Sequence, residues 1–276
     1  MQLEDEVGDV LEKAMRRSGL DDEGLAERSG VAASRILDAI DYRSELESDE
    51  LRRLAAALDL NEVGLCALGK GRYPLPAIEE LPFSVWPLRM PHGIGVVNAY
   101  LVAGEGCQRG LLFDTGADIA ALESVLPPHL RTIDAVFLTH VETEHAGGLC
   151  AVVAHFGEPP AFIPRGAVAP CGSQVGEGEV RTFGQLEVTV FSTPGHAPDH
   201  NCYLVRAPAA PAARGLLISG DLIFAGSAGG GYFCHRQLQT HLRRMLSTVP
   251  PATVIAPGHG PLTTVENELR YNPFLA

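Results

Sequence analysis

Basic residues are scarce in this sequence, and long apolar runs are absent from it. Its 21 Lys and Arg stand against 34 Asp and Glu, which gives a formal net charge of −13. This balance argues against a surface for nucleic acids or anionic membranes, because both bind through Lys and Arg. No stretch reaches the roughly 18 apolar residues that a membrane span needs. Residues 1–9 are acidic and lack the basic start and apolar run of a signal peptide, so we expect a cytoplasmic protein.

Closely spaced cysteine pairs are also absent, since none of the six cysteines forms a C-x-x-C motif. In a cytoplasmic protein of this size we expect them to be small apolar residues, most of them buried. No sequence context marks one of them as a nucleophile. They are Cys66, Cys107, Cys150, Cys171, Cys202 and Cys234.

The length and composition suit a large domain with a small one beside it. The chain has 276 residues, 46% of them hydrophobic and 20% charged, so it can bury a sizeable core. Three prolines interrupt residues 69–82 and oppose regular structure there. We predict a helical domain over 1–71, a linker over 72–81 and a larger domain over 82–276.

The first 70 residues show the periodicity of helices. Their apolar faces are formed by Val7, Val10, Leu11 and Ala14, and by Leu51, Leu54, Ala55 and Leu58. Asp21 is expected to cap a short helix that Gly30 ends. The segment GLAERSGV at 24–31, with SRI at 34–36, resembles the helix-turn-helix of the Cro and phage-repressor family. In that family the second helix of the pair reads the DNA major groove.

The charge of this region argues against the DNA-binding role that the resemblance implies. Acidic residues outnumber basic ones by 17 to 9 over residues 1–70. The expected recognition helix carries Arg35 but also Asp38 and Asp41, which phosphates would repel. We therefore expect no DNA binding, and a domain that docks onto a partner protein or a second copy of the chain.

Beyond residue 82 the pattern changes to short apolar strands, some of them separated by helices. The expected strands are 96–102, 110–113, 135–139, 186–191, 202–205, 216–219 and 254–256. The expected helices are 119–126, 147–155 and 238–246. Many strands end in a polar or Gly-containing turn, a common place for reactive residues because the sheet holds the loop firmly.

Side chains that bind metals gather at these strand ends. Four of them lie within the six residues HVETEH, directly after one strand, and two histidines each follow a Pro-Gly pair. Each alone is weak, but seven donors at four strand ends are difficult to explain as a surface accident. The seven are His140, Glu142, Glu144, His145, His196, Asp221 and His259.

These motifs resemble those of the metallo-β-lactamase superfamily, over roughly residues 82–276. The matching segments are 98–101, 112–116, 139–148, 193–196, 220–221 and 257–259, and segments 220–227 and 258–264 are similar to the glyoxalase-II-like branch. The resemblance implies an α+β fold, an αββα sandwich, after a small all-α N-terminal domain. It also implies two transition-metal ions per chain.

The first motif departs from the family pattern H-x-H-x-D-H at two positions. Glu142 replaces the second His, as in the H-x-E-x-D-H of flavodiiron proteins, and Glu144 replaces the Asp. The resemblance implies that His140, Glu142 and His196 hold one metal, that Glu144, His145 and His259 hold the other, and that Asp221 bridges them. A set of carboxylates and imidazoles suits iron or zinc, and manganese as well.

The leading function is hydrolysis of a small ester, thioester, amide or similar molecule by a metal-bound hydroxide. Asp221 would orient this nucleophile, and His200 is a second candidate for a catalytic role. The alternative is a diiron oxidoreductase or oxygenase acting on O2, peroxide, NO or an organic substrate, which Glu142 favours. A third interpretation, a metal-containing sensor, is motivated by the helical domain.

Other residues near these motifs receive lesser roles. Asp114 is expected to hydrogen-bond a ligand or cap a turn, and Tyr232 to be an ordinary loop residue. The glycines 229–231 predict a flexible loop where the glyoxalase-like branch has a polar segment. This difference argues against a glutathione thioester as the substrate.

Overall fold

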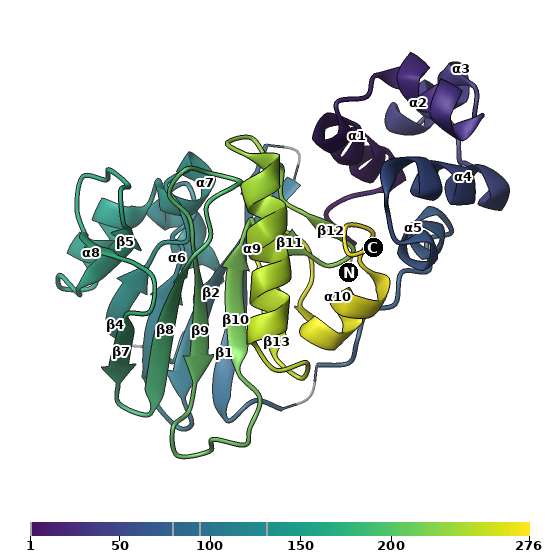
Figure 1. Ribbon diagram of the computed structural model, residues 1–276. Helices are drawn as coiled ribbons and strands as arrows, with labels where there is room; N and C mark the ends of the chain where they lie inside the picture. The colour runs from purple at the N-terminus through teal and green to yellow at the C-terminus, as the bar shows by residue number, and fades with distance from the viewer. Residues whose placement is uncertain (1, 79, 94, 131) are drawn as a thin grey trace.

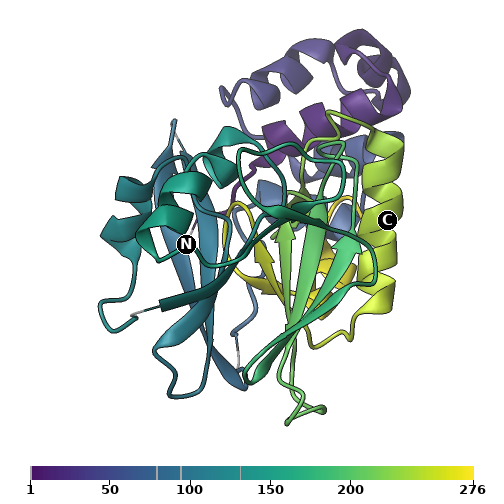
Figure 2. The same ribbon diagram turned by 90° about the vertical axis from the view of Figure 1, so that its left-hand side faces the viewer.

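The computed structural model describes residues 2–78, 80–93, 95–130 and 132–276. Two β-sheets face each other, helices cover both outer faces, and helices α1 to α5 form a separate group at one end (Figures 1 and 2). The predicted αββα sandwich with a small helical N-terminal region is therefore confirmed. No helix among the described residues is both long and apolar enough to cross a membrane.

The first sheet is mixed and has the strand order β1-β2-β3-β4-β5-β6. The sequence did not predict β1, which contains Pro87 and Pro91 and pairs along its length with β2. Proline is tolerated there because β1 is an edge strand, whose outer side donates no ladder hydrogen bonds. The strands are Phe83–His92, Gly95–Gly104, Arg109–Phe113, Thr132–Phe137, Ala161–Pro164 and Ser173–Val175.

The second sheet has the order β14-β13-β10-β9-β8-β7, and β10 and β13 run parallel in it. All the strands predicted in this part of the chain are present. In the order just given, they are Thr263–Thr264, Val254–Pro257, Leu216–Gly220, Asn201–Arg206, Leu186–Ser192 and Val180–Phe183. A separate hairpin joins β11, Ile223–Phe224, to β12, Ser227–Ala228.

Three apolar clusters hold the layers together. Side chains of both sheets interdigitate between them. Among these, the rings of Phe113, Phe137 and Tyr203 contact one another at centroid distances of 5.1 to 5.7 Å. A second cluster packs the first sheet against α6 and α8. The helices of the sandwich are α6 (Ile119–Val125), α7 (Thr143–Ala146), α8 (Leu149–His155), α9 (His235–Thr248) and α10 (Val265–Tyr271).

The N-terminal helices are built as the sequence predicts. Asp21 accepts a hydrogen bond from the Gly24 N–H and so caps α2, and Gly30 ends that helix with a φ of 67°. Residues 72–78 and 80–82, which include the described part of the predicted linker, form no helix or strand. The helices are α1 (Val7–Ser18), α2 (Asp22–Ser29), α3 (Ala33–Ile40), α4 (Ser48–Leu58) and α5 (Glu62–Gly69).

These helices share an apolar core with the sandwich. One cluster of buried residues runs from α1, α4 and α5 to α9 and the outer face of the second sheet. Figure 1 shows α5 beside α10, and there the Asn61 N–H donates to the Pro273 carbonyl at 2.8 Å. The N-terminal region is therefore packed against its own chain over part of its surface.

The expectation that most cysteines are buried is wrong. Among the six, which are all free thiols, Cys202 is buried, Cys150 is exposed and the other four are half-buried. Cys150 lies on the outward face of α8, where its Sγ is 3.0 Å from the Sγ of Cys171. The average behaviour of cysteine favours the interior, whereas the place of each cysteine in the fold decides its exposure.

Candidate metal centre

The seven predicted ligands come from four chain segments that meet at one end of the sandwich. Strand β4 leads to His140, β8 to His196, β10 to Asp221 and β13 to His259. Strands β8, β10 and β13 point the same way, because β8 and β10 are both antiparallel to β9. The turns that follow them therefore lie side by side, and the loop after β4 faces them from the other sheet.

Asp221 lies at the centre of the cluster. Its Oδ1 is 3.5 Å from His145 Nε2, and its Oδ2 is 3.6 Å from His196 Nε2 and 3.5 Å from His259 Nε2. Two groups of potential ligand atoms result, each within 4.8 Å of one another, and Asp221 belongs to both. They are His140, His196 and Asp221, and His145, Asp221 and His259.

The protein holds the Nδ1 of each of these four histidines, so Nε2 is the atom that faces the centre. The contacts are His140 with Thr139 Oγ1 at 3.0 Å, His145 with Asp114 Oδ2 at 3.0 Å, His196 with the Gly230 carbonyl at 2.9 Å and His259 with the Val96 carbonyl at 3.0 Å. An Nδ1–H that donates to an oxygen leaves a lone pair on Nε2, which is the form that binds a metal.

Several of the inward-facing atoms form no geometrically sound hydrogen bond with any described residue, although Glu142 lies near one of them, His196 Nε2. The Nε2 atoms of His140, His145 and His196, together with Asp221 Oδ1, are buried and lack a hydrogen-bond partner among the described residues. None of these four side chains is more than 7% exposed. Buried polar atoms are nearly always satisfied, so this group fits a bound cation.

The electrostatics of the cluster also favour positive charge. Burial by itself would raise the pKa of Asp221, but His145, His259, His140 and His196 together outweigh it and hold that pKa well below its usual range. Burial lowers the pKa of His145, yet Asp221 and Asp114 raise it to about 9. Burial keeps the pKa of His140 well below its usual value. A site that binds a proton on one histidine and keeps its carboxylate ionised can bind a metal ion in the same place.

The two glutamates lie at the rim. Glu142 Oε1 is 3.3 Å from His196 Nε2, and this contact lowers the pKa of Glu142. Glu144 Oε2 is 3.9 Å from His92 Nε2, and Glu144 is in neither group of close ligand atoms. Glu142 is likewise in neither group, but its carboxylate lies beside two members of the first one, His196 and His140. The Glu144 side chain instead lies near His92 at the end of β1.

His200 supports the centre from behind. It is 1% exposed, its Nδ1 contacts Thr193 Oγ1 at 2.8 Å, and its Nε2 accepts the Asp221 N–H at 3.2 Å. Burial lowers its pKa to about 3, so it is neutral. Because both ring nitrogens are engaged, this geometry favours positioning of Asp221 over the predicted catalytic role. Asp114 contacts His145 and Thr139, as expected of a residue that orients a ligand.

The glycines at 229–231 are packed rather than open, which corrects the expected flexible loop. All three are buried. A Cβ on Gly229 would lie 1.8 Å from the Asp221 carbonyl oxygen, so only glycine lets this segment pass so close. The adjoining Gly230 carbonyl holds His196, and Tyr232 lies against the same histidine with ring centroids 5.4 Å apart.

A pocket of about 300 Å³ opens onto the centre, and residues from the N-terminal region form part of its lining. This contribution was not predicted, since no local sequence pattern connects residues 4–16 with motifs beyond residue 140. Tyr232, which was expected to be an ordinary loop residue, lines the pocket too. The lining includes Glu4, Asp5, Asp9, Glu12, Lys13, Arg16, Glu142, Glu144, His196, Asp221, Tyr232 and His259.

Known proteins resemble this chain over the sandwich. The probable metallo-hydrolase YqgX of Bacillus subtilis (strain 168) is 30% identical over 215 residues, 68% of this chain and 96% of the relative. The hydroxyacylglutathione hydrolase of Salmonella arizonae is 28% identical over 153 residues, 55% of this chain and 57% of the relative. The crystal structure of TTHA1623 in a di-iron-bound form is 30% identical, with a TM-score of 0.54 over 69% of this chain and 100% of that one. The sequence profile of the metallo-beta-lactamase superfamily matches residues 92–259, and this chain belongs to that superfamily.

Proposed function

We propose that this chain is a dinuclear metal-dependent hydrolase of a small ester, thioester, amide or similar molecule. One observation carries the proposal, namely the buried and unpartnered Nε2 and Oδ1 atoms that converge on a single centre. Leaving each such atom unsatisfied costs about 1–3 kcal/mol, and two cations would remove that cost. The names of two relatives, a probable metallo-hydrolase and a hydroxyacylglutathione hydrolase, support the same reaction type.

The residues divide naturally between two metals. His140 and His196 would hold one ion, His145 and His259 the other, and Asp221 would contribute an oxygen to each. Glu142 would add a carboxylate to the first ion, and Glu144 could add one to the second after turning away from His92. When bound, such a pair lowers the pKa of water from 15.7 toward about 7 and polarises the substrate oxygen.

The chain itself supplies orientation and a restricted pocket. The Asp221 carboxylate, kept ionised by its histidines and fixed through its N–H by His200, would accept a hydrogen bond from the attacking water. The phenol of Tyr232 would contact the substrate beside His196. The buried histidine rings keep bulk water from the opposite side of the reacting centre.

A diiron oxidoreductase or oxygenase is the second candidate. The carboxylate of Glu142 beside His196 favours it, because an anionic oxygen ligand stabilises higher oxidation states of iron. The di-iron-bound form of TTHA1623, a chain 30% identical to this one, supports the choice of metal.

The first experiment measures the metal content of the wild type and of Asp221→Ala. We expect about two transition-metal ions per wild-type chain, as in other two-metal sites, and loss of at least one from the variant. Glu27→Ala, an exposed change in α2, is the control and should keep both. A full load in Asp221→Ala would rule out the bridging role.

The second experiment separates the two candidate functions in the same preparations. Hydrolysis of a panel of esters, thioesters and amides by the wild type, and its loss in Asp221→Ala, would support the hydrolase. Absorption in the near ultraviolet from an oxo-bridged diferric centre, without turnover on the panel, would favour the oxidoreductase.

A further inference from the structure

We infer that helix α1 and the segment before it form a negatively charged wall of the active-site pocket, which admits small neutral or cationic substrates and slows the entry of anionic ones. The inference rests on the proposed two-metal site and names the class of substrate that can reach it. It gives the N-terminal region a part in specificity, in addition to any docking role.

The wall is made from one face of α1 and from the residues that precede it. The side chains at positions 5, 9, 12, 13 and 16 are spaced as neighbours on one side of a helix and its N-terminal extension. They line the same pocket as Glu142, Asp221 and His259. At its inner end Glu4 Oε1 lies 3.7 Å from His259 Nδ1, so the wall reaches the candidate metal ligands.

Specific contacts hold the wall in place. Lys13 Nζ donates to Asp5 Oδ2 at 2.5 Å and to the Ala228 carbonyl at 2.9 Å, and the hydroxyl of Ser227 also donates to Asp5. Asp5 is 8% exposed. The first residues of the chain are therefore tied to the β11–β12 hairpin beside the pocket.

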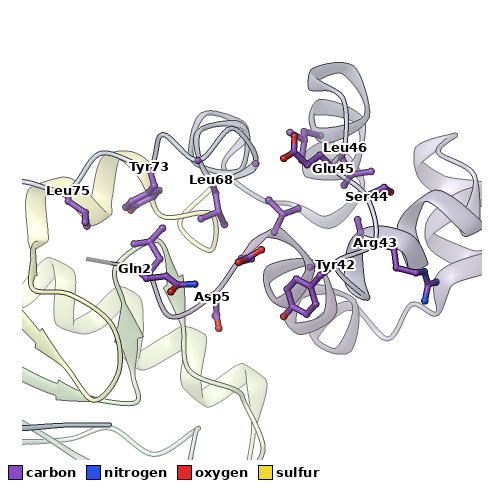
Figure 3. A pocket seen from close by; sticks show the side chains of 18 residues that line it. Gln2, Asp5, Tyr42, Arg43, Ser44, Glu45, Leu46, Leu68, Tyr73 and Leu75 are labelled. Atoms are coloured by element: carbon purple, nitrogen blue, oxygen red, sulfur yellow. The ribbon is translucent and has the colours of Figure 1, made fainter. Parts of the chain in front are cut away.

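The other side of the same segment faces a second cavity. Figure 3 shows Asp5 beside this cavity, on the segment that joins Gln2 to α1. Gln2 lies on the side of Tyr73, in the linker, and Tyr42 lies against α1. The hydroxyl of Tyr42 donates to Asp9 Oδ1 at 2.5 Å. The helical region thus fixes α1 from behind, and α1 presents its charged face to the metal pocket.

The charge of the wall is net negative. It contributes four carboxylates and two cations to the pocket lining, and both cations are already paired. Lys13 is bound to Asp5, and Arg16 Nη2 is 2.7 Å from Glu12 Oε1. Among the residues that the structure describes, this wall offers an entering anion no unpaired cation, so the approach of an anion is opposed. A neutral or cationic molecule meets no such barrier.

Size points in the same direction. A volume of about 300 Å³ lies at the small end of ligand pockets, which span about 300–1,000 Å³. The family profile begins at residue 92, so α1 lies outside the region shared with the family. The wall is therefore a feature added to the shared sandwich. The pocket therefore suits compact acyl esters, thioesters or amides with an uncharged or cationic leaving group. Glutathione thioesters, which are larger and anionic, do not fit it.

The test is the rate at which two chelators remove zinc from the loaded full-length protein. EDTA is polyanionic, whereas 1,10-phenanthroline is neutral. Glu12→Lys makes the wall more positive and should speed removal by EDTA about ten-fold at low salt, an effect typical of electrostatic steering. Arg16→Glu should slow it. Neither variant should change the rate of zinc removal by phenanthroline. The difference between each variant and the wild type in removal by EDTA should shrink in 1 M salt, where the Debye length is about 3 Å.

Glu27→Lys is the matched control, because it makes the same charge change at an exposed position of α2 outside the pocket. The inference is wrong if Glu27→Lys speeds zinc removal by EDTA as much as Glu12→Lys does. It is also wrong if Glu12→Lys changes the rates of removal by both chelators equally. Turnover of acetyl thioesters of glutathione and of cysteamine distinguishes the two proposals. Charge-selective zinc removal without turnover of these thioesters or of any member of the ester, thioester and amide panel would refute only the hydrolase. Turnover without charge selectivity would refute only the wall.

Discussion

At the scale of single residues, the partner of each histidine Nδ1 sets the properties of the centre. A hydroxyl, a carboxylate and two backbone carbonyls perform this task at His140, His145, His196 and His259. Asp221 and then the carboxylate of Asp114 raise the pKa of His145 to about 9, which makes its ring a strong donor to a metal. Three of these four partners are invisible as motifs, because a carbonyl can come from any residue and a hydroxyl from many.

Glu142 is the residue whose replacement tests the identity of the metal. We expect Glu142→His to raise the zinc-to-iron ratio of protein grown with both metals available, because a neutral nitrogen replaces an anionic oxygen beside His196. Elemental analysis of both proteins, purified side by side, measures the ratio.

Glu27→His serves as the control for an added histidine on the surface and should leave the ratio unchanged. An unchanged ratio in Glu142→His, or a shift toward iron, would mean that Glu142 does not select the metal. The diiron candidate would then lose its main support.

At the scale of secondary-structure elements, the contact between α5 and the end of α10 joins the two parts of the chain. Gly64 is central to it, since a Cβ there would lie 1.8 Å from the Tyr271 carbonyl oxygen. Asn61 Nδ2 donates to the Arg270 carbonyl at 3.1 Å in the same contact. The two backbones therefore approach more closely than any side chain at position 64 allows.

Gly64→Ala should lower the free energy of unfolding, by about 1–3 kcal/mol as for other overpacked sites. Alanine is the better helix former, so a helix-propensity effect alone would act in the opposite direction. Thermal or urea unfolding of the variant measures the change. In Gly95→Ala, whose added Cβ has its nearest neighbour at 3.8 Å, we expect little effect; equal stability of both variants would contradict the proposed close contact.

At the scale of the whole molecule, the charge and internal pairing of the helical region bear on its partners. Arg35, the basic residue of the expected recognition helix, is bound to Glu50 at 3.0 Å and to Ser44 at 2.9 Å. With that side chain engaged and the region acidic, we propose that it does not read DNA.

Fluorescence anisotropy with random and selected duplexes at physiological salt checks this proposal, and we expect no saturable binding below micromolar concentration. The isolated sandwich is a poor comparison, because removing residues 1–71 would uncover the core shared by α1, α5 and α9. Arg35→Ala in the full chain is the better control. Nanomolar binding that this variant loses would show that the charge argument fails.

Much of this protein follows from local sequence pattern. Short apolar runs that end in polar or Pro-Gly turns predict the strands, and the positions of His140, His196, Asp221 and His259 just after them predict a shared site. These features are predictable because a short apolar run and the geometry of its turn depend on neighbouring residues. Local pattern is also why β1 was missed, since Pro87 and Pro91 oppose a strand unless it lies at an edge.

Only the tertiary structure decided how the helical region meets the site. Asp5 and Ser227 are 222 positions apart, yet their hydrogen bond ties the start of the chain to the pocket. Helical periodicity predicted which face of α1 is apolar and left its charged face as ordinary surface. The surface that the charged face of α1 meets depends on how the helical region packs against the sandwich. The burial of apolar side chains is non-directional, so it does not fix this orientation in advance.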